Sequence, residues 1–103
     1  MSQTPAGAAA PRPTGPRERV LGAFLREGQL VRIPARAAKR RVILEHIVAV
    51  FEPGVKIPER EVDAALRGFY EHDYVSLRRY LIDTGLMARA NGLYWRTGGY
   101  VAV

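Results

Sequence analysis

The sequence predicts a small α+β fold that is mainly helical. Three observations point to it: a length of 103 residues, apolar residues at helical spacing in four segments, and an Asn-Gly turn signal near the C-terminal end. In order, the expected elements are a short helix, then helix, short strand, helix, tight turn, helix and two-stranded hairpin. This order is typical of a winged helix-turn-helix-like domain, a three-helix core with a C-terminal two-stranded wing, here preceded by a short helix.

The chain divides into three regions by composition. Residues 1–17 are rich in Pro, Ala and Gly and cannot bury enough apolar surface to offset chain entropy, so we expect a disordered basic arm. Residues 18–97 are expected to form the winged-helix-like domain, and residues 98–103 a flexible tail. Within the domain, Arg19–Glu27 is expected to be a short helix that ends at Gly28, with an apolar face of Val20, Leu21, Phe24 and Leu25.

The first long helix is expected after the β-prone residues 30–33. Pro34 is typical of a first helical turn, and the helix is expected to continue to about Phe51. By 3.6-residue counting, its apolar residues occupy one arc: Ile43, Leu44, Ile47, Val48, Val50 and Phe51. That arc predicts the core-facing side of the helix.

The second and third long helices follow a short strand expected at residues 55–57. Pro58 is expected at the first helical position of the second helix, which buries a stripe of Val62, Ala65, Leu66 and Phe69. Asp73 is expected to cap a third helix from Tyr74 to Thr84, and Gly85 to end it. The inward-facing residues of this third helix are expected to be Leu77, Tyr80 and Leu81.

The wing is expected at Met87–Arg96. Asn91-Gly92 is the strongest short hairpin signal, because a type I′ turn needs positive φ at both central residues. Tyr94 and Trp95 suit a strand and must point to opposite faces, so one of them is expected to pack on the core.

Positive charge is concentrated early in the chain. Residues 12–41 hold nine arginine or lysine side chains against Glu18 and Glu27, a net charge of +7, whereas residues 42–103 carry −1. Such a balance calls for a partner or another purpose. The arginines in and just after the arm, Arg12, Arg17 and Arg19, could contact a polyanion, although a solvated tail is the favoured interpretation. The absence of cysteine excludes disulfides and thiolate chemistry, and with no signal-like or membrane-spanning apolar run we expect a cytoplasmic protein that does not associate with membranes.

Several motifs together resemble a known bacterial family, the domain of unknown function number two thousand and eighty-seven. They are F-L-R-E-G-Q-L-V-R-I-P, K-R-R-V-I-L-E-H, E-R-E-V-D and L-R-R-Y-L-I-D-T-G-L-M-A-R followed by N-G-L-Y-W-R, and they cover about Phe24 to Arg96. Pro58 and Asp63 depart from the family pattern, which usually has a Thr or Ser cap and an Asn there. The resemblance implies a role in transcriptional regulation, sometimes beside a separate helix-turn-helix domain, and assigns no site residue.

The arginine pair of the third helix is expected to divide its roles. With Leu77 and Leu81 inward, Arg79 lies on the exposed face, where its guanidinium could meet a DNA phosphate, a guanine edge or plain solvent. Arg78 lies at the core boundary and is better placed to pair with Asp63 or Glu61. The exposed face lacks the cluster of Asn, Gln, Arg and Lys side chains that base readout usually requires.

Two further groups of cations are candidates for DNA contact. Four lie at the start of the first long helix, where positive charge opposes the helix dipole: Arg36, Lys39, Arg40 and Arg41. They are expected either to pair with the acidic second helix or to form a phosphate patch. Arg89 and Arg96 lie on the hairpin strands, where a wing touches the DNA backbone or where a charge serves only solubility.

No catalytic or metal site is expected. His46 and His72 have no metal-ligand spacing, and no nucleophile elbow, phosphate loop or dinucleotide fingerprint occurs. We therefore expect no cofactor and no enzyme activity. The leading hypothesis is a transcriptional-regulator domain that binds DNA mainly through phosphates. The alternative is a regulatory module that senses an effector or binds a partner protein without touching DNA, and a homodimer is compatible with both.

Overall fold

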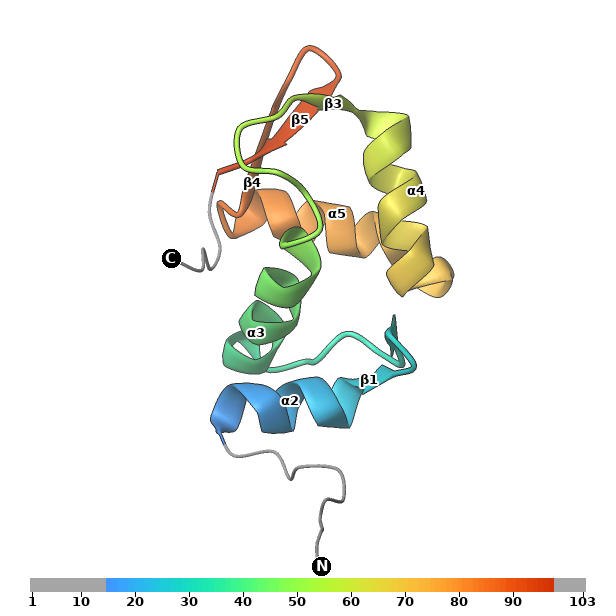
Figure 1. Ribbon diagram of the computed structural model, residues 1–103, viewed down its shortest axis with the longest axis vertical. Coiled ribbons are helices and arrows are strands. Elements are labelled where there is room, and N and C mark those ends of the chain that lie inside the picture. Colours follow the sequence, from blue (N-terminus) through green and yellow to red (C-terminus); the bar gives the residue numbers. More distant parts are fainter. Residues whose placement is uncertain (1–14, 98–103) are drawn as a thin grey trace, which may run out of the picture.

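The computed structural model describes residues 15–97 and shows an α+β fold that is mainly helical (Figure 1). The helices are α2 (Pro16–Phe24), α3 (Ala37–Val48), α4 (Glu59–Phe69) and α5 (Tyr74–Asp83), with a 3-10 turn, η1 (Glu71–Asp73), between the last two. The strands are β1 (Leu25–Arg26), β2 (Gln29–Leu30), β3 (Ile57–Pro58), β4 (Met87–Ala90) and β5 (Leu93–Arg96).

The strands form two antiparallel sheets at opposite ends of the molecule. Three of them make one sheet in the order β3-β5-β4, in which Ile57 pairs with Tyr94 and Ala88 pairs with Trp95. The other sheet is the short β1–β2 hairpin beside α2. Figure 1 shows α3, α4 and α5 between these two ends. The C-terminal hairpin therefore projects from the helical body on the side away from α2.

One hydrophobic core joins α3, α4, α5 and the three-stranded sheet. Its fully buried side chains include Ile43, Leu44, Ile47, Val48, Val62, Leu66, Leu77, Leu81 and Leu86. Phe24 and Leu30 extend this core to the N-terminal end, and Met87 and Tyr94 extend it into the hairpin. Both ends of the molecule are thus attached to the helical body by buried side chains.

The N-terminal elements differ from the predicted ones. Helix α2 begins at Pro16 and ends at Phe24, instead of spanning Arg19–Glu27. The reason is a tight turn at Glu27 and Gly28, which have φ values of 54° and 80° and reverse the chain into β2. Of the expected arm, residues 1–17, the first fourteen lie outside the described residues. Pro16 and Arg17, which were also assigned to the arm, belong to the first turn of α2.

Helix α3 is shorter than predicted at both ends. Arg36 is its N-cap with extended backbone, so Pro34 precedes the helix by three residues, and the last helical residue is Val48. Phe51 is buried as expected, but Val50 is 55% exposed, so its place in the core face was wrong. The helical phase no longer applies at Val50 because the chain turns after Val48.

The start signals of α4 and α5 agree more closely with the structure. Pro58 is the N-cap of α4 and also the last residue of β3, one position before the predicted place. Asp73 caps α5 as predicted, since its Oδ1 accepts a hydrogen bond from the Ser76 backbone N–H at 3.2 Å. The Ser76 hydroxyl donates to Asp73 Oδ2 at 2.6 Å.

The hairpin was predicted correctly at Met87–Arg96. Asn91 and Gly92 have φ values of 55° and 79°, the left-handed backbone that a type I′ turn requires. Tyr94 packs on the core with 1% of its surface exposed, and Trp95 on the other face is half-buried beneath Lys56. The expected tail, residues 98–103, lies outside the described residues.

Candidate functional site

A shallow groove of about 200 Å³ separates helix α5 from the C-terminal hairpin. Its lining comes from the exposed face of α5 and the inner side of the hairpin: Val75, Arg78, Arg79, Ile82, Asp83, Arg89 and Tyr94. Arg78 is paired with Asp63 of α4, so the positive balance of this lining comes from Arg79 and Arg89 against Asp83. The arrangement therefore suits an anionic group that approaches between α5 and the hairpin.

Arg79 is the most accessible cation of helix α5. Its side chain is exposed, and it makes no hydrogen bond or ion pair with other residues in the range 15–97. All five guanidinium donors are therefore available to a ligand. Arg79 lies where the helical phase predicted it, on the face opposite Leu77 and Leu81.

Arg78 has a structural partner, as its position at the core boundary predicted. Its Nη1 donates to Asp63 Oδ1 at 2.6 Å and lies 3.9 Å from Glu59 Oε2. Partial burial lowers the pKa of Arg78, but the hydrogen bond and the charges of Asp63 and Glu59 outweigh it, so the pKa is raised above its ordinary value. Arg78 is thus a permanent cation that ties α5 to α4.

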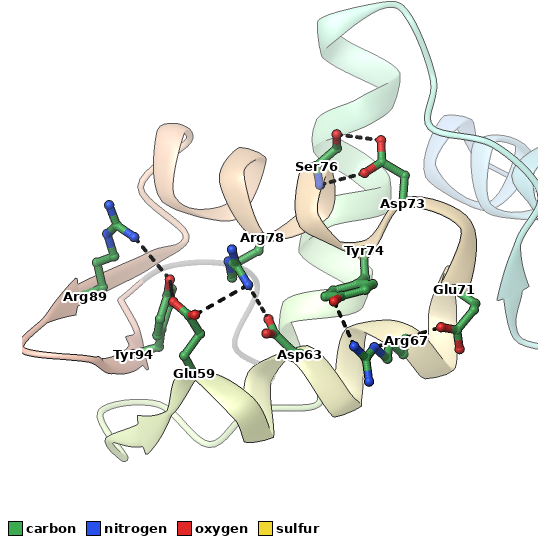
Figure 2. Close-up of polar contacts among 10 residues, drawn as sticks. All are labelled: Glu59, Asp63, Arg67, Glu71, Asp73, Tyr74, Ser76, Arg78, Arg89 and Tyr94. Carbon is green, nitrogen blue, oxygen red and sulfur yellow. Dashed lines mark hydrogen bonds and ion pairs between the residues drawn. The ribbon is translucent and has the colours of Figure 1, made fainter.

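A chain of polar contacts connects the hairpin to the start of α4 (Figure 2). Arg89 Nη1 donates to the Tyr94 hydroxyl at 3.3 Å, and that hydroxyl donates to Glu59 Oε1 at 2.8 Å. Because Glu59 also faces Arg78, the contacts continue to Asp63. Figure 2 shows the five side chains in a row from the hairpin to α4.

Arg96 does not contribute to the exposed surface, contrary to expectation. It is only 7% exposed, and its Nη1 donates to the Phe51 carbonyl at 3.1 Å. The physical reason is the period of two along a strand, which places residue 96 on the same inward face as Tyr94. Arg96 therefore holds the end of the hairpin to the loop after α3.

The four cations at the start of α3 form neither of the two expected arrangements as a group. Arg40 donates to the carbonyls of Pro34 and Ala35 at 3.3 and 2.9 Å and stacks over the Tyr80 ring, with its Cζ 4.4 Å from the centroid.

The neighbouring Arg41 pairs with Glu45 at 3.1 Å and donates to the carbonyl of Thr84, the C-cap of α5, at 3.2 Å. Arg36 and Lys39 are exposed and form no ion pair within the described residues. In residues 15–97 none of the four pairs with a carboxylate of α4. Arg40 and Arg41 are held by contacts within the domain, and the exposed Arg36 and Lys39 are the two that are open to a ligand.

Neither histidine contributes to this groove. His46 packs edge-on against Phe69 with ring centroids 6.3 Å apart, and His72 lies near Tyr70. Within residues 15–97 no group of three or more His, Asp or Glu side chains could hold a metal ion. Over the same range, no helix has the length and apolar character needed to cross a membrane.

The sequence did not predict the contact between Tyr94, which lines the groove, and Glu59 at the start of α4. Tyr94 was expected as a core or stacking side chain. Glu59 was expected as a first-turn carboxylate of the second helix and as one possible partner of the cations at the start of the first long helix. The two residues are 35 positions apart in sequence, and the pairing of β3 with β5 brings them together. No local sequence pattern indicates this contact. If the pairing of β3 with β5 had been predicted, the position of Glu59 directly after β3 would have indicated it.

The groove and the fold thus define a small α+β domain with an arginine-lined surface between a helix and a hairpin. A family model described as an uncharacterized protein conserved in bacteria (DUF2087) matches residues 29–96, so the chain belongs to this family. No curated protein matches, and no solved structure matches.

Proposed function

We propose that this protein is a winged-helix DNA-binding domain of a bacterial transcriptional regulator, with α5 as the recognition helix and β4–β5 as the wing. The order α3, β3, α4, α5, β4, β5 and the sheet order β3-β5-β4 support this proposal. The observation that carries it is the groove, because Arg79 on the helix and Arg89 on the hairpin line its two sides.

The proposed contacts are mainly with phosphates. On the exposed face of α5, the neighbours of Arg79 are Val75, Ile82 and Asp83, none of which matches the side chains that commonly read guanine or adenine edges. Arg79 and Arg89 each present a fork that fits phosphate oxygens. Affinity would then be supplied by backbone contacts, with weak dependence on base sequence.

Fluorescence anisotropy of a labelled 20-base-pair duplex, titrated at several salt concentrations, tests this proposal. We expect log affinity to fall linearly with log salt, at a slope of about −0.9 per neutralised phosphate. Arg79→Ala and Arg89→Ala should each weaken binding and make the slope shallower by roughly one unit.

Arg26→Ala is the matched control, because Arg26 is exposed on β1, at the end of the molecule away from the wing (Figure 1). It removes the same charge and should leave the slope nearly unchanged. Equal effects of all three substitutions would show that DNA is attracted by the overall positive charge and not bound at a defined groove. No anisotropy change even at low salt would remove DNA from the proposal.

A second candidate function, docking of a partner protein, is favoured by the apolar groups at the groove. Val75 on α5 is 40% exposed and lines the groove beside Ile82. Such a partner would bind with little salt dependence, and Val75→Asp would abolish binding. Phosphate-driven DNA binding would instead respond strongly to salt and only moderately to Val75→Asp.

A further inference from the structure

The backbone contacts of the wing with the rest of the fold are made by β5 and the turn. Strand β5 pairs with β3 through Ile57 and Pro58, its Arg96 forms a bridge with Pro53, and the Gly92 carbonyl accepts a hydrogen bond from the Glu59 N–H at 3.2 Å. Strand β4, which carries Arg89, pairs only with β5 within the described residues. A two-stranded hairpin alone is marginally stable in water. Side chains must therefore contribute to fixing β4 relative to α5, and with it the position of Arg89 at the groove.

The Tyr94 hydroxyl is well placed to do this. The ring is 1% exposed, and its oxygen both accepts from Arg89 Nη1 at 3.3 Å and donates to Glu59 Oε1 at 2.8 Å (Figure 2). The bond to the carboxylate is charge-assisted and thus stronger than one between neutral groups. One phenol oxygen accordingly connects β4, β5 and the first residue of α4.

The order of groups in this chain also preserves the charge of Arg89. A direct ion pair between Arg89 and Glu59 would neutralise the cation that faces the groove. Instead the neutral phenol stands between them, while the Glu59 carboxylate lies 3.9 Å from Arg78. Arg89 is thereby held by one N–H, and its charge and other donors remain available.

We propose that Tyr94 and Glu59 are positioning residues: through the Tyr94 hydroxyl they hold the Arg89 guanidinium in the groove, ready for a phosphate opposite Arg79. The inference rests on the proposed DNA binding and adds how the wing contact is prepared. Fixing Arg89 in advance reduces the side-chain entropy that binding would otherwise cost.

A double-mutant cycle on DNA affinity tests this. Tyr94→Phe keeps the buried ring and removes only the hydroxyl, and we expect duplex affinity to fall roughly threefold to tenfold, the value of one hydrogen bond. In the Arg89→Ala background the same change should have almost no effect, because there is no guanidinium left to position. An equal loss in both backgrounds would overturn the inference, since it is what general damage to the fold would produce.

Two substitutions of Glu59 provide the matched pair. Glu59→Gln keeps an acceptor oxygen for the Tyr94 hydroxyl and should retain most of the affinity. Glu59→Ala should lower affinity as Tyr94→Phe does, and add nothing to that change. If the Gln and Ala variants bind alike, the hydrogen bond to Glu59 is not what positions Arg89.

A readout without DNA separates this inference from the proposed function. In ¹⁵N NMR of the arginine side chains, rotation of the Arg89 guanidinium should be slower than that of the exposed Arg26, and Tyr94→Phe should make the two alike. Equal rotation in the wild-type protein would overturn the positioning role whatever the DNA result. If Arg89 rotates slowly but the protein has no affinity for duplex DNA, the positioning of Arg89 by Tyr94 is supported and only the proposed DNA binding is contradicted.

Discussion

At the scale of single residues, the arginines show how burial decides what a charge can do. Arg78 and Arg79 are adjacent, yet one is paired with Asp63 and the other makes no hydrogen bond or ion pair within residues 15–97. Arg89 lies between these extremes, since it has a neutral partner. A count of basic residues therefore overstates the charge that a partner can reach, and Arg79 and Arg89 are the side chains to which the groove gives access.

His46 gives a prediction about pH. Partial burial, followed by the charge of Arg17, lowers its pKa below the ordinary value of 6.5. The folded protein therefore favours the neutral imidazole. The stability gained by burying this neutral ring is fully present above the pKa that His46 has in the unfolded chain. It is lost as pH falls through the lower folded pKa.

We expect an NMR titration of the His46 ring to have its midpoint below 6.5. The free energy of unfolding, measured with urea, should decrease between pH 7 and pH 5, and His46→Gln should remove part of that decrease. A midpoint at or above 6.5 would contradict the stated effect of burial.

The sequence reveals residue roles where helical phase decides them and fails where strand pairing decides them. The division between Arg78 and Arg79 followed from counting 100° per residue around α5. The burial of Arg96 needed one more fact, that Tyr94 is the aromatic side chain facing inward. Once that is known, the alternation of the strand assigns Arg96 to the same face.

At the scale of elements, positive backbone φ angles determine where the chain reverses. Asn91-Gly92 was recognised because both residues tolerate the left-handed region. Glu27-Gly28 makes a similar reversal between β1 and β2 and was missed, since glutamate is uncommon there and the residues before it have helical spacing. The sequence thus predicted the turn only where both central residues are of a type that favours positive φ.

The two glycines Gly92 and Gly68 allow a matched test of this reasoning. A Cβ at either position would meet no atom within 4 Å, but Gly92 has φ +79° whereas Gly68 lies within helix α4. Gly92→Ala should lower the free energy of unfolding by about 1 kcal/mol, because alanine is strained in the left-handed region. Gly68→Ala should raise it by about 0.5 kcal/mol through helix propensity.

Thermal or urea unfolding of the two variants beside the wild-type protein measures the difference. The β4–β5 hairpin should also lose protection from amide hydrogen exchange in Gly92→Ala, since Gly92 accepts a hydrogen bond at its carbonyl from the Glu59 N–H at 3.2 Å. Changes of the same sign in the free energies of unfolding of Gly92→Ala and Gly68→Ala would show that the turn conformation does not control stability here.

At the scale of the whole molecule, α2 and the family domain share one core. The family model matches residues 29–96, but Phe24 of α2 lies before that range and is 7% exposed within the common hydrophobic cluster. Helix α2 packs against α3, and the β1–β2 hairpin returns the chain to the body. The N-terminal helix is therefore an integral part of this fold.

Phe24→Ala should accordingly reduce the free energy of unfolding by about 3 kcal/mol, as expected for truncating a buried phenylalanine. Val31→Ala is the control, because Val31 is 45% exposed and should change stability by less than about 0.5 kcal/mol. Urea unfolding followed by tryptophan fluorescence measures both. Similar small effects would mean that α2 adds little to the stability of the domain.

The pairing of β3 with β5 has a consequence for the order of folding. The hairpin and the α4–α5 unit are local in sequence, whereas Ile57 meets Tyr94 across 37 positions, so closing the sheet carries the larger loop entropy. We expect this contact to form late, and to be among the first to open in the native state. Such an opening would release Glu59 from Tyr94 while the helices stay folded, so the β4–β5 hairpin could detach and re-dock as one cooperative unit.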